Sequence, residues 1–113
     1  MSLEIAESDW KVFRKLHAIA LERFLERAVS EIERLVTDKG KPSVDRYWDA
    51  VEFIKGNRKE LARLFDDMRR STALLQLAAI YSQKLLTAEE MSRFSPEARE
   101  TVEAYLRIKI GSA

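Results

Sequence analysis

An apolar stripe runs through the middle of the chain at steps of three and four residues, the spacing that keeps side chains on one face of an α-helix. The stripe keeps its phase past Arg58, the one stripe position occupied by a charged residue, and past the helix-weakening pair Gly56-Asn57. We therefore expect one very long helix from Val44 to Leu86, with the same face against one neighbour throughout. The stripe consists of Tyr47, Val51, Ile54, Leu61, Phe65, Met68, Thr72, Leu75 and Ala79.

The segment around Gly56 favours a different interpretation when it is read locally. Lys55-Gly56-Asn57 resembles a helix end, and Asn57 with Glu60 resembles a new capping box. An interior glycine costs only about 1 kcal/mol relative to alanine, whereas a true break would usually lose the phase of the stripe. We expect the helix to continue.

The composition limits the fold class. The chain has 113 residues, enough for one domain with a hydrophobic core, and only three glycines and two prolines, which favours helices nearly everywhere. Its net charge of +1 draws it neither to nucleic acid nor to an anionic membrane as a whole. It has no cysteine, which excludes disulfides and thiolate chemistry.

Capping signals divide the rest of the chain into helices. Ser8 and Asp9 predict the start of a first helix at Trp10, and a turn follows at 38–42. The first helix carries two converging apolar stripes, which make its face wide enough for two neighbours. A capping box at 87–90 predicts a short helix, and Ser95-Pro96 predicts the start of a last one. The predicted fold is all-α, a long antiparallel helical hairpin plus a short helix and a C-terminal helix.

The distal part of the second helix is the candidate interaction surface. A helix of 43 residues would be about 65 Å long, against about 44 Å for the first helix, so its far end needs cover from the C-terminal helices or another molecule. That end is also apolar around most of its circumference. Phe53 lies roughly opposite the long stripe and is a further candidate contact. The predicted interaction residues are Leu74, Leu77, Ala78, Tyr81, Leu85 and Phe53.

Two groups of titratable residues are candidate chemical sites. His17 is the sole histidine, and its helical neighbours Phe13, Ala20 and Phe24 are apolar, which favours a packed side chain over a catalytic one. Asp45, Asp49 and Glu52 line one flank of the second helix and could bind a hard cation, but a solvated flank is the favoured interpretation. No metal ligand set, cofactor motif or catalytic residue is expected.

The densest basic region lies between Lys55 and Arg70. Phosphate recognition would need several of its cations on one side of the helix. Asp66 and Asp67 lie close to three of the arginines, so we expect mainly a paired or solvated surface and no specific nucleic-acid binding. The cations are Lys55, Arg58, Lys59, Arg63, Arg69 and Arg70.

Several phrases of the sequence carry a resemblance. These are residues 8–13 with 20–24, residues 66–77, and residues 85–96. In them the chain resembles a group of small uncharacterised bacterial all-helical proteins. The resemblance implies a bacterial origin and no particular activity.

The sequence favours a non-enzymatic, homo-oligomeric helical protein-interaction module, most simply a dimer resembling a coiled coil. The acidic N-terminal residues do not resemble a secretory signal, and no apolar run reaches the roughly 18 residues of a membrane span. We therefore expect a cytoplasmic protein without membrane contact. The alternatives are a small all-α enzyme with an Arg/Glu-lined site, or a weak nucleic-acid or phosphate binder through residues 55–70.

Overall fold

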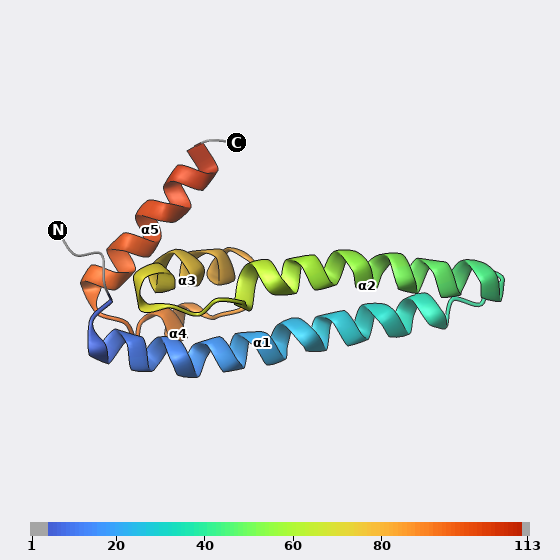
Figure 1. The fold of residues 1–113 in the computed structure, drawn as a ribbon, viewed down its shortest axis with the longest axis horizontal. Helices are drawn as coiled ribbons and strands as arrows, with labels where there is room; N and C mark the ends of the chain where they lie inside the picture. Colours follow the sequence, from blue (N-terminus) through green and yellow to red (C-terminus); the bar gives the residue numbers. More distant parts are fainter. Residues whose placement is uncertain (1–4, 112–113) are drawn as a thin grey trace.

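The computed structural model describes residues 5–111, which form helices and no strands. The first two helices make a long antiparallel hairpin, and the later ones gather at one end of it (Figure 1). The all-α class predicted from the sequence is confirmed, and the molecule measures 57 × 30 × 24 Å. The elements are α1 (Glu7–Val36), α2 (Ser43–Phe65), the single 3₁₀ turn η1 (Arg70–Thr72), α3 (Ala73–Ser82), α4 (Ala88–Met91) and α5 (Pro96–Gly111).

Helix α2 continues through Gly56, as the phase of the apolar stripe predicted. It does not continue to Leu86, and the prediction of one 43-residue helix is wrong. The chain leaves the helix at Asp66, which is extended, and Asp67 has a left-handed backbone with φ of 62°. Two aspartates at a helix C-terminus oppose the helix dipole, and aspartate tolerates the left-handed conformation better than most residues. Periodicity alone did not reveal this stop.

Two polar side chains from other helices form hydrogen bonds with the backbone carbonyl groups at the end of α2. His17 Nε2 of α1 lies 3.0 Å from Phe65 O. Gln76 Nε2 of α3 donates to Leu64 O at 2.9 Å and to Asp66 O at 3.0 Å. The last carbonyls of a helix lack partners within it, so these contacts stabilise the end and bring α3 back beside α2. His17 is a packed structural residue, as its apolar neighbours predicted.

The hydrophobic core lies where α3, α4 and α5 cover the N-terminal half of α1 and the end of α2. We call this end of the molecule the body. Its core is made by all five α-helices and the segments that join them. The largest fully buried side chains are Phe13, Leu16, Leu64, Leu77, Ile80, Leu85 and Val102.

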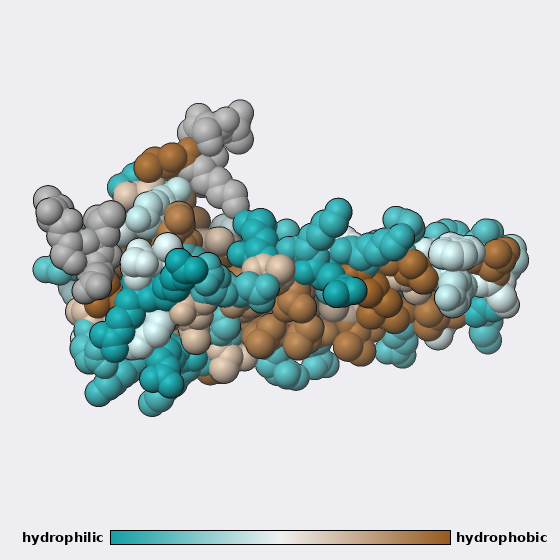
Figure 2. Space-filling model, viewed as in Figure 1, coloured by the Kyte–Doolittle hydropathy of each residue, from teal (hydrophilic) through white to brown (hydrophobic). Residues whose placement is uncertain are grey.

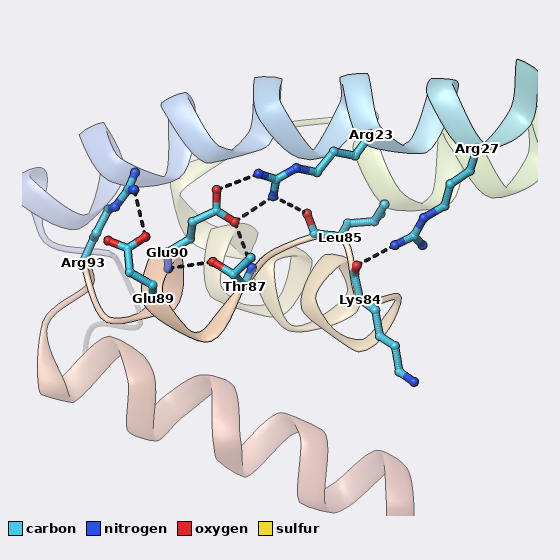
Figure 3. Close-up of polar contacts among 8 residues, drawn as sticks. All are labelled: Arg23, Arg27, Lys84, Leu85, Thr87, Glu89, Glu90 and Arg93. Carbon is cyan, nitrogen blue, oxygen red and sulfur yellow. Dashed lines mark hydrogen bonds and ion pairs between the residues drawn. The ribbon is translucent and has the colours of Figure 1, made fainter. Parts of the chain in front are cut away.

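A bidentate ion pair joins α4 to α1 (Figure 3). Arg23 donates to both carboxylate oxygens of Glu90, at 2.7 and 2.9 Å, and also to Leu85 O at 2.9 Å. Glu90 completes the predicted capping box, since it accepts from Thr87 N while its own N donates to Thr87 Oγ1. The hydrogen bonds from Arg23, and then that from Thr87 N, lower the pKa of Glu90 to about 2.

The start of α5 is held by α1 in a way that the sequence did not predict. Asp9 is buried in the first turn of α1, which begins at Glu7, and it does not cap that helix. It accepts hydrogen bonds from Ser95 N at 2.8 Å and Ser95 Oγ at 2.6 Å. Ser95 Oγ in turn accepts from Ala98 N, so a carboxylate of α1 supports the N-terminus of α5.

Gly56→Ala should stabilise the protein by up to about 1 kcal/mol, because alanine removes the entropic cost of glycine within a helix. A Cβ at this position would meet no atom within 4 Å. Urea unfolding of both proteins measures the difference. A loss of stability would contradict a continuous, unstrained α2 at this residue.

Acid should weaken the attachment of α4. Glu90 has a folded pKa below its ordinary value of 4.5, so its contribution is present above about pH 4.5 and is lost as the pH falls toward 2. Glu90→Gln should cost about 2 kcal/mol at pH 7, less than the full pKa shift would give, because Arg23 is 40% exposed and water screens the pair.

The measurement is the free energy of unfolding in urea at pH 7 and at pH 2.5. The deficit of Glu90→Gln should shrink at the lower pH. Glu89→Gln is the matched control, since Glu89 makes only an exposed pair with Arg93. An equal deficit for Glu90→Gln at both pH values would show that the charge of Glu90 is not what matters.

Candidate interaction site

The hairpin extends well beyond the body as a bare pair of helices (Figure 1). Arg27 marks the edge of the body, where it donates to Gln83 O and Lys84 O after the end of α3. We call the outer part of the hairpin the arm, and define it as residues 25–36 of α1 and 43–57 of α2. Arg46 closes its tip by donating to Val36 O at 2.6 Å. The arm consists of two helices alone, so each helix is covered only on the side that faces the other.

The contact between the two helices of the arm mixes large apolar side chains with small and polar ones. It includes the small buried residues Ala28 and Ala50 and several polar groups. Phe24, Ala28, Glu31, Phe53 and Asn57 line one shallow groove between the helices. We call this contact the inner seam; it consists of Phe24, Ala28, Glu31 and Leu35 from α1 and Arg46, Ala50, Phe53 and Asn57 from α2.

A second seam lies beside the first on both helices, and it is entirely apolar. Its residues follow each other at steps of three and four, the spacing of a coiled-coil contact. In an antiparallel hairpin, the residues that directly follow the inner-seam residues lie on the same side of the pair in both helices. We call this surface the outer seam; it consists of Leu25, Val29, Ile32, Val36, Val44, Tyr47, Val51 and Ile54.

The outer seam is open to solvent. Val29 is 63% exposed, Tyr47 62% and Val44 60%. Leu25, Val36 and Ile54 are also exposed, and Ile32 and Val51 are half-buried. Figure 2 shows the corresponding apolar band along the arm, with hydrophilic side chains along both of its edges. Soluble monomers rarely leave a contiguous apolar patch of this kind uncovered.

The predicted orientation of the second helix is therefore wrong within the arm. The stripe Tyr47, Val51, Ile54 was expected to face the first helix, and Phe53 to face away from it. Instead Phe53 is half-buried beside Phe24 and Ala28, and the stripe belongs to the outer seam. Helix α2 is apolar over a wide arc, and the sequence did not show which part of that arc meets α1.

The interaction surface predicted on residues 74–85 is largely covered within the chain. Leu77 and Leu85 are each 1% exposed and Ala78 is buried, all three in the core of the body. Leu74 and Tyr81 are partly buried against the same core. The reversal of the chain after α2 explains this, because it folds α3 onto α1 and α5. Of the predicted interaction residues, none lies on the outer seam.

An open groove lies between α3 and α5. Its volume is about 590 Å³, and Leu75, Ala79 and Tyr105 contribute to an apolar wall. Asp66 and Arg63 also line it, and Arg63 is held by Glu60 of its own helix. The volume is sufficient for a small molecule, but the polar groups of the groove do not form a matched set around a common point.

Three of the six cations of residues 55–70 are held in close ion pairs, and of these Arg69 pairs with an aspartate as predicted. Arg63 pairs with Glu60, and Arg69 with Asp67 at 2.9 Å. Arg70 pairs with Glu7 at 2.7 Å and lies over the Trp10 ring, 5.4 Å from its centroid. These pairs serve the surface and the start of α1. Arg58 and Lys59 have no ion pair among the described residues, and Lys55 has only a contact of 3.9 Å with Glu52.

The acidic row on α2 is a solvated flank. Lys41 reaches Asp49 at 2.9 Å, which raises the pKa of Lys41, and Lys55 lies 3.9 Å from Glu52. Among residues 5–111, no three histidine or carboxylate side chains are grouped so that they could hold a metal ion. Within the same range no helix has both the length and the apolar character of a membrane crossing.

Comparison of the chain with protein-family models, with curated proteins and with solved structures finds no match.

We expect no specific nucleic-acid binding at physiological salt and only weak binding at low salt, because half of the region's six cations are held in ion pairs and the others form only a small cluster. Fluorescence anisotropy with labelled DNA and RNA at two salt concentrations measures this. Submicromolar affinity in about 150 mM salt, lost on replacing Arg58, Lys59 and Arg63, would contradict it.

Proposed function

We propose that the protein is a non-enzymatic helical protein-interaction module that forms a homodimer through the outer seam. The observation that carries the proposal is that an unbroken apolar seam of the arm faces solvent, while the inner seam mixes three large apolar side chains with alanine and polar residues. A helix of a four-helix bundle needs an apolar face wide enough for two neighbours. Each arm helix has such a face and only one neighbour.

A second copy supplies the missing layer with the surface that is already present. Two outer seams placed face to face would bury sixteen side chains of matching apolar character, eight from each copy. Symmetric pairing of one patch with itself is the commonest form of small oligomer. We retain a bacterial, cytoplasmic protein as the setting of this proposal.

The enzyme alternative has less support. It needs arginine and glutamate side chains that converge on a cavity. The Arg23–Glu90 pair joins two helices, and the other arginine pairs lie mostly along the surface of one helix. These contacts are of the kind that stabilise a fold, which favours association over catalysis.

Val29→Glu should give a folded monomer. Val29 is 63% exposed in one chain, so a carboxylate there costs little until a second copy covers it. Size-exclusion chromatography with light scattering should find the wild type dimeric at high micromolar concentration and Val29→Glu monomeric, with unchanged helical circular dichroism.

Two variants serve as controls. Ser30→Glu introduces the same charge at the next residue, which is exposed and lies about 100° further around α1, away from the outer seam, and it should remain dimeric. Leu77→Glu should instead unfold the chain, because Leu77 is in the core of the body. A wild type that remains monomeric at high micromolar concentration would refute the homodimer.

A further inference from the structure

We propose that the two copies pair with their arms parallel and their hairpin tips side by side, and that ion pairs from Glu22 to Arg58 and from Glu26 to Lys55 of opposite copies select this arrangement. The inference rests on the proposed homodimer and specifies its geometry. It follows from the charges along the two edges of the outer seam and from the position of the body.

The edges of the outer seam carry opposite charges. On a helical wheel, Glu22, Glu26 and Glu33 flank the seam on its α1 side, about 50–90° beyond its centre. On the α2 side, Arg58 continues the line of the seam toward the body, with Lys55 and Lys59 beside it. All six side chains are exposed. The surface is therefore lopsided, acidic along α1 and basic along α2.

Five of these groups are free to take a partner. Glu22, Glu26, Glu33, Arg58 and Lys59 take part in none of the ion pairs within the described residues. Lys55 has only its contact of 3.9 Å with Glu52. The edge charges are thus little used by the single chain.

The register of the hairpin sets the heights of these groups. His17 lies beside Phe65 at the body end, and Val36 lies beside Arg46 at the tip. In this register, Glu22 lies at nearly the same height along the arm as Arg58, within about one helical turn. Glu26 and Lys55 are matched in the same way. Within one chain the two edges lie on opposite sides of the seam, so the groups do not meet there.

Face-to-face pairing has two symmetric forms. If the two-fold axis runs along the arms, the tips coincide and each α1 lies on the partner's α2, so acidic edges meet basic edges at equal heights. If the axis runs across the arms, the tips point in opposite directions and each α1 lies on the partner's α1. Each edge then faces the partner's edge of the same kind, so the acidic groups meet no base. Charges at the edges of helical seams set partner orientation in this way, and like charges disfavour the wrong form.

The body does not obstruct the parallel form. It is attached to α1 through Arg23 and Arg27, which bind Glu90 and the carbonyls after α3. Arg27 lies about 160° around α1 from Val29, so α3 and α4 occupy the side of the hairpin opposite the outer seam. Two bodies can therefore lie at the same end of the bundle, facing outward.

The size of the surface indicates a weak, concentration-dependent dimer. The outer seam and its edges comprise fourteen residues per copy, fewer than the roughly 20–30 of a standard stable interface. Edge charges have a measurable influence in such an interface, because little else fixes the orientation.

A charge-swap series tests the ion pairs. Glu22→Arg and Arg58→Glu each place like charges along both edge contacts of the parallel dimer, and each should raise the dissociation constant about tenfold. The double variant Glu22→Arg/Arg58→Glu should restore the wild-type value within about threefold. Sedimentation equilibrium gives the constants, and Ser30→Glu is the control that changes charge away from the seam.

Cross-linking tests the orientation, and it is simple because the chain has no cysteine. Lys39→Cys places a thiol at the exposed tip. A bis-maleimide with a short spacer should link the copies efficiently if the tips coincide, whereas Ser30→Cys on the other side of the arm should link poorly.

The outcomes separate the two proposals. A wild type that stays monomeric would overturn the homodimer and this arrangement with it. A dimer that resists Val29→Glu would place the interface elsewhere and overturn both as well. A dimer disrupted by Val29→Glu, but with no link at Lys39→Cys or no rescue in the double swap, would leave the homodimer standing and overturn the parallel arrangement alone.

Discussion

The end of α2 at Phe65 decides the shape of the whole molecule. Its last carbonyls are bound by His17 and Gln76, so the helix stops in a satisfied state and the chain reverses. Because α3 then folds back, α3 and α4 lie against the same half of α1, and α5 packs on α3. The other half of the hairpin receives no third layer. The exposed arm is thus a consequence of where one helix ends.

The arm is unusual in the order of its two seams. Helices usually place their most apolar stripe against their nearest neighbour. Here the seam between α1 and α2 mixes Phe24, Leu35 and Phe53 with alanine and polar residues, while the continuous apolar seam lies to one side. A mixed inner seam and an apolar outer seam suit a four-helix arrangement, in which both are internal. This is why we look for the missing layer in a second copy.

Much of the architecture could be predicted from local signals. The turn at 38–42, the Thr87–Glu90 capping box and the start of α5 after Ser95 all depend on neighbouring residues, and a sequence displays these directly. The end of α2 at Asp66 depends on His17 and Gln76, which are distant in sequence. The apolar stripe keeps its phase past this point and therefore did not indicate it. The interaction residues were misplaced for the same reason: once α3 folds back, Leu77 becomes core, and Tyr47 is left exposed on the arm.

The central claim is that the outer seam is covered by another copy of the chain. Hydrogen exchange measured by mass spectrometry, at low and high protein concentration, tests it most directly because it reports the arm and the body separately. We expect amide protection in residues 25–36 and 43–57 to rise with concentration, while protection in α3 and α5 stays constant. Equal protection of the arm at both concentrations would contradict the account.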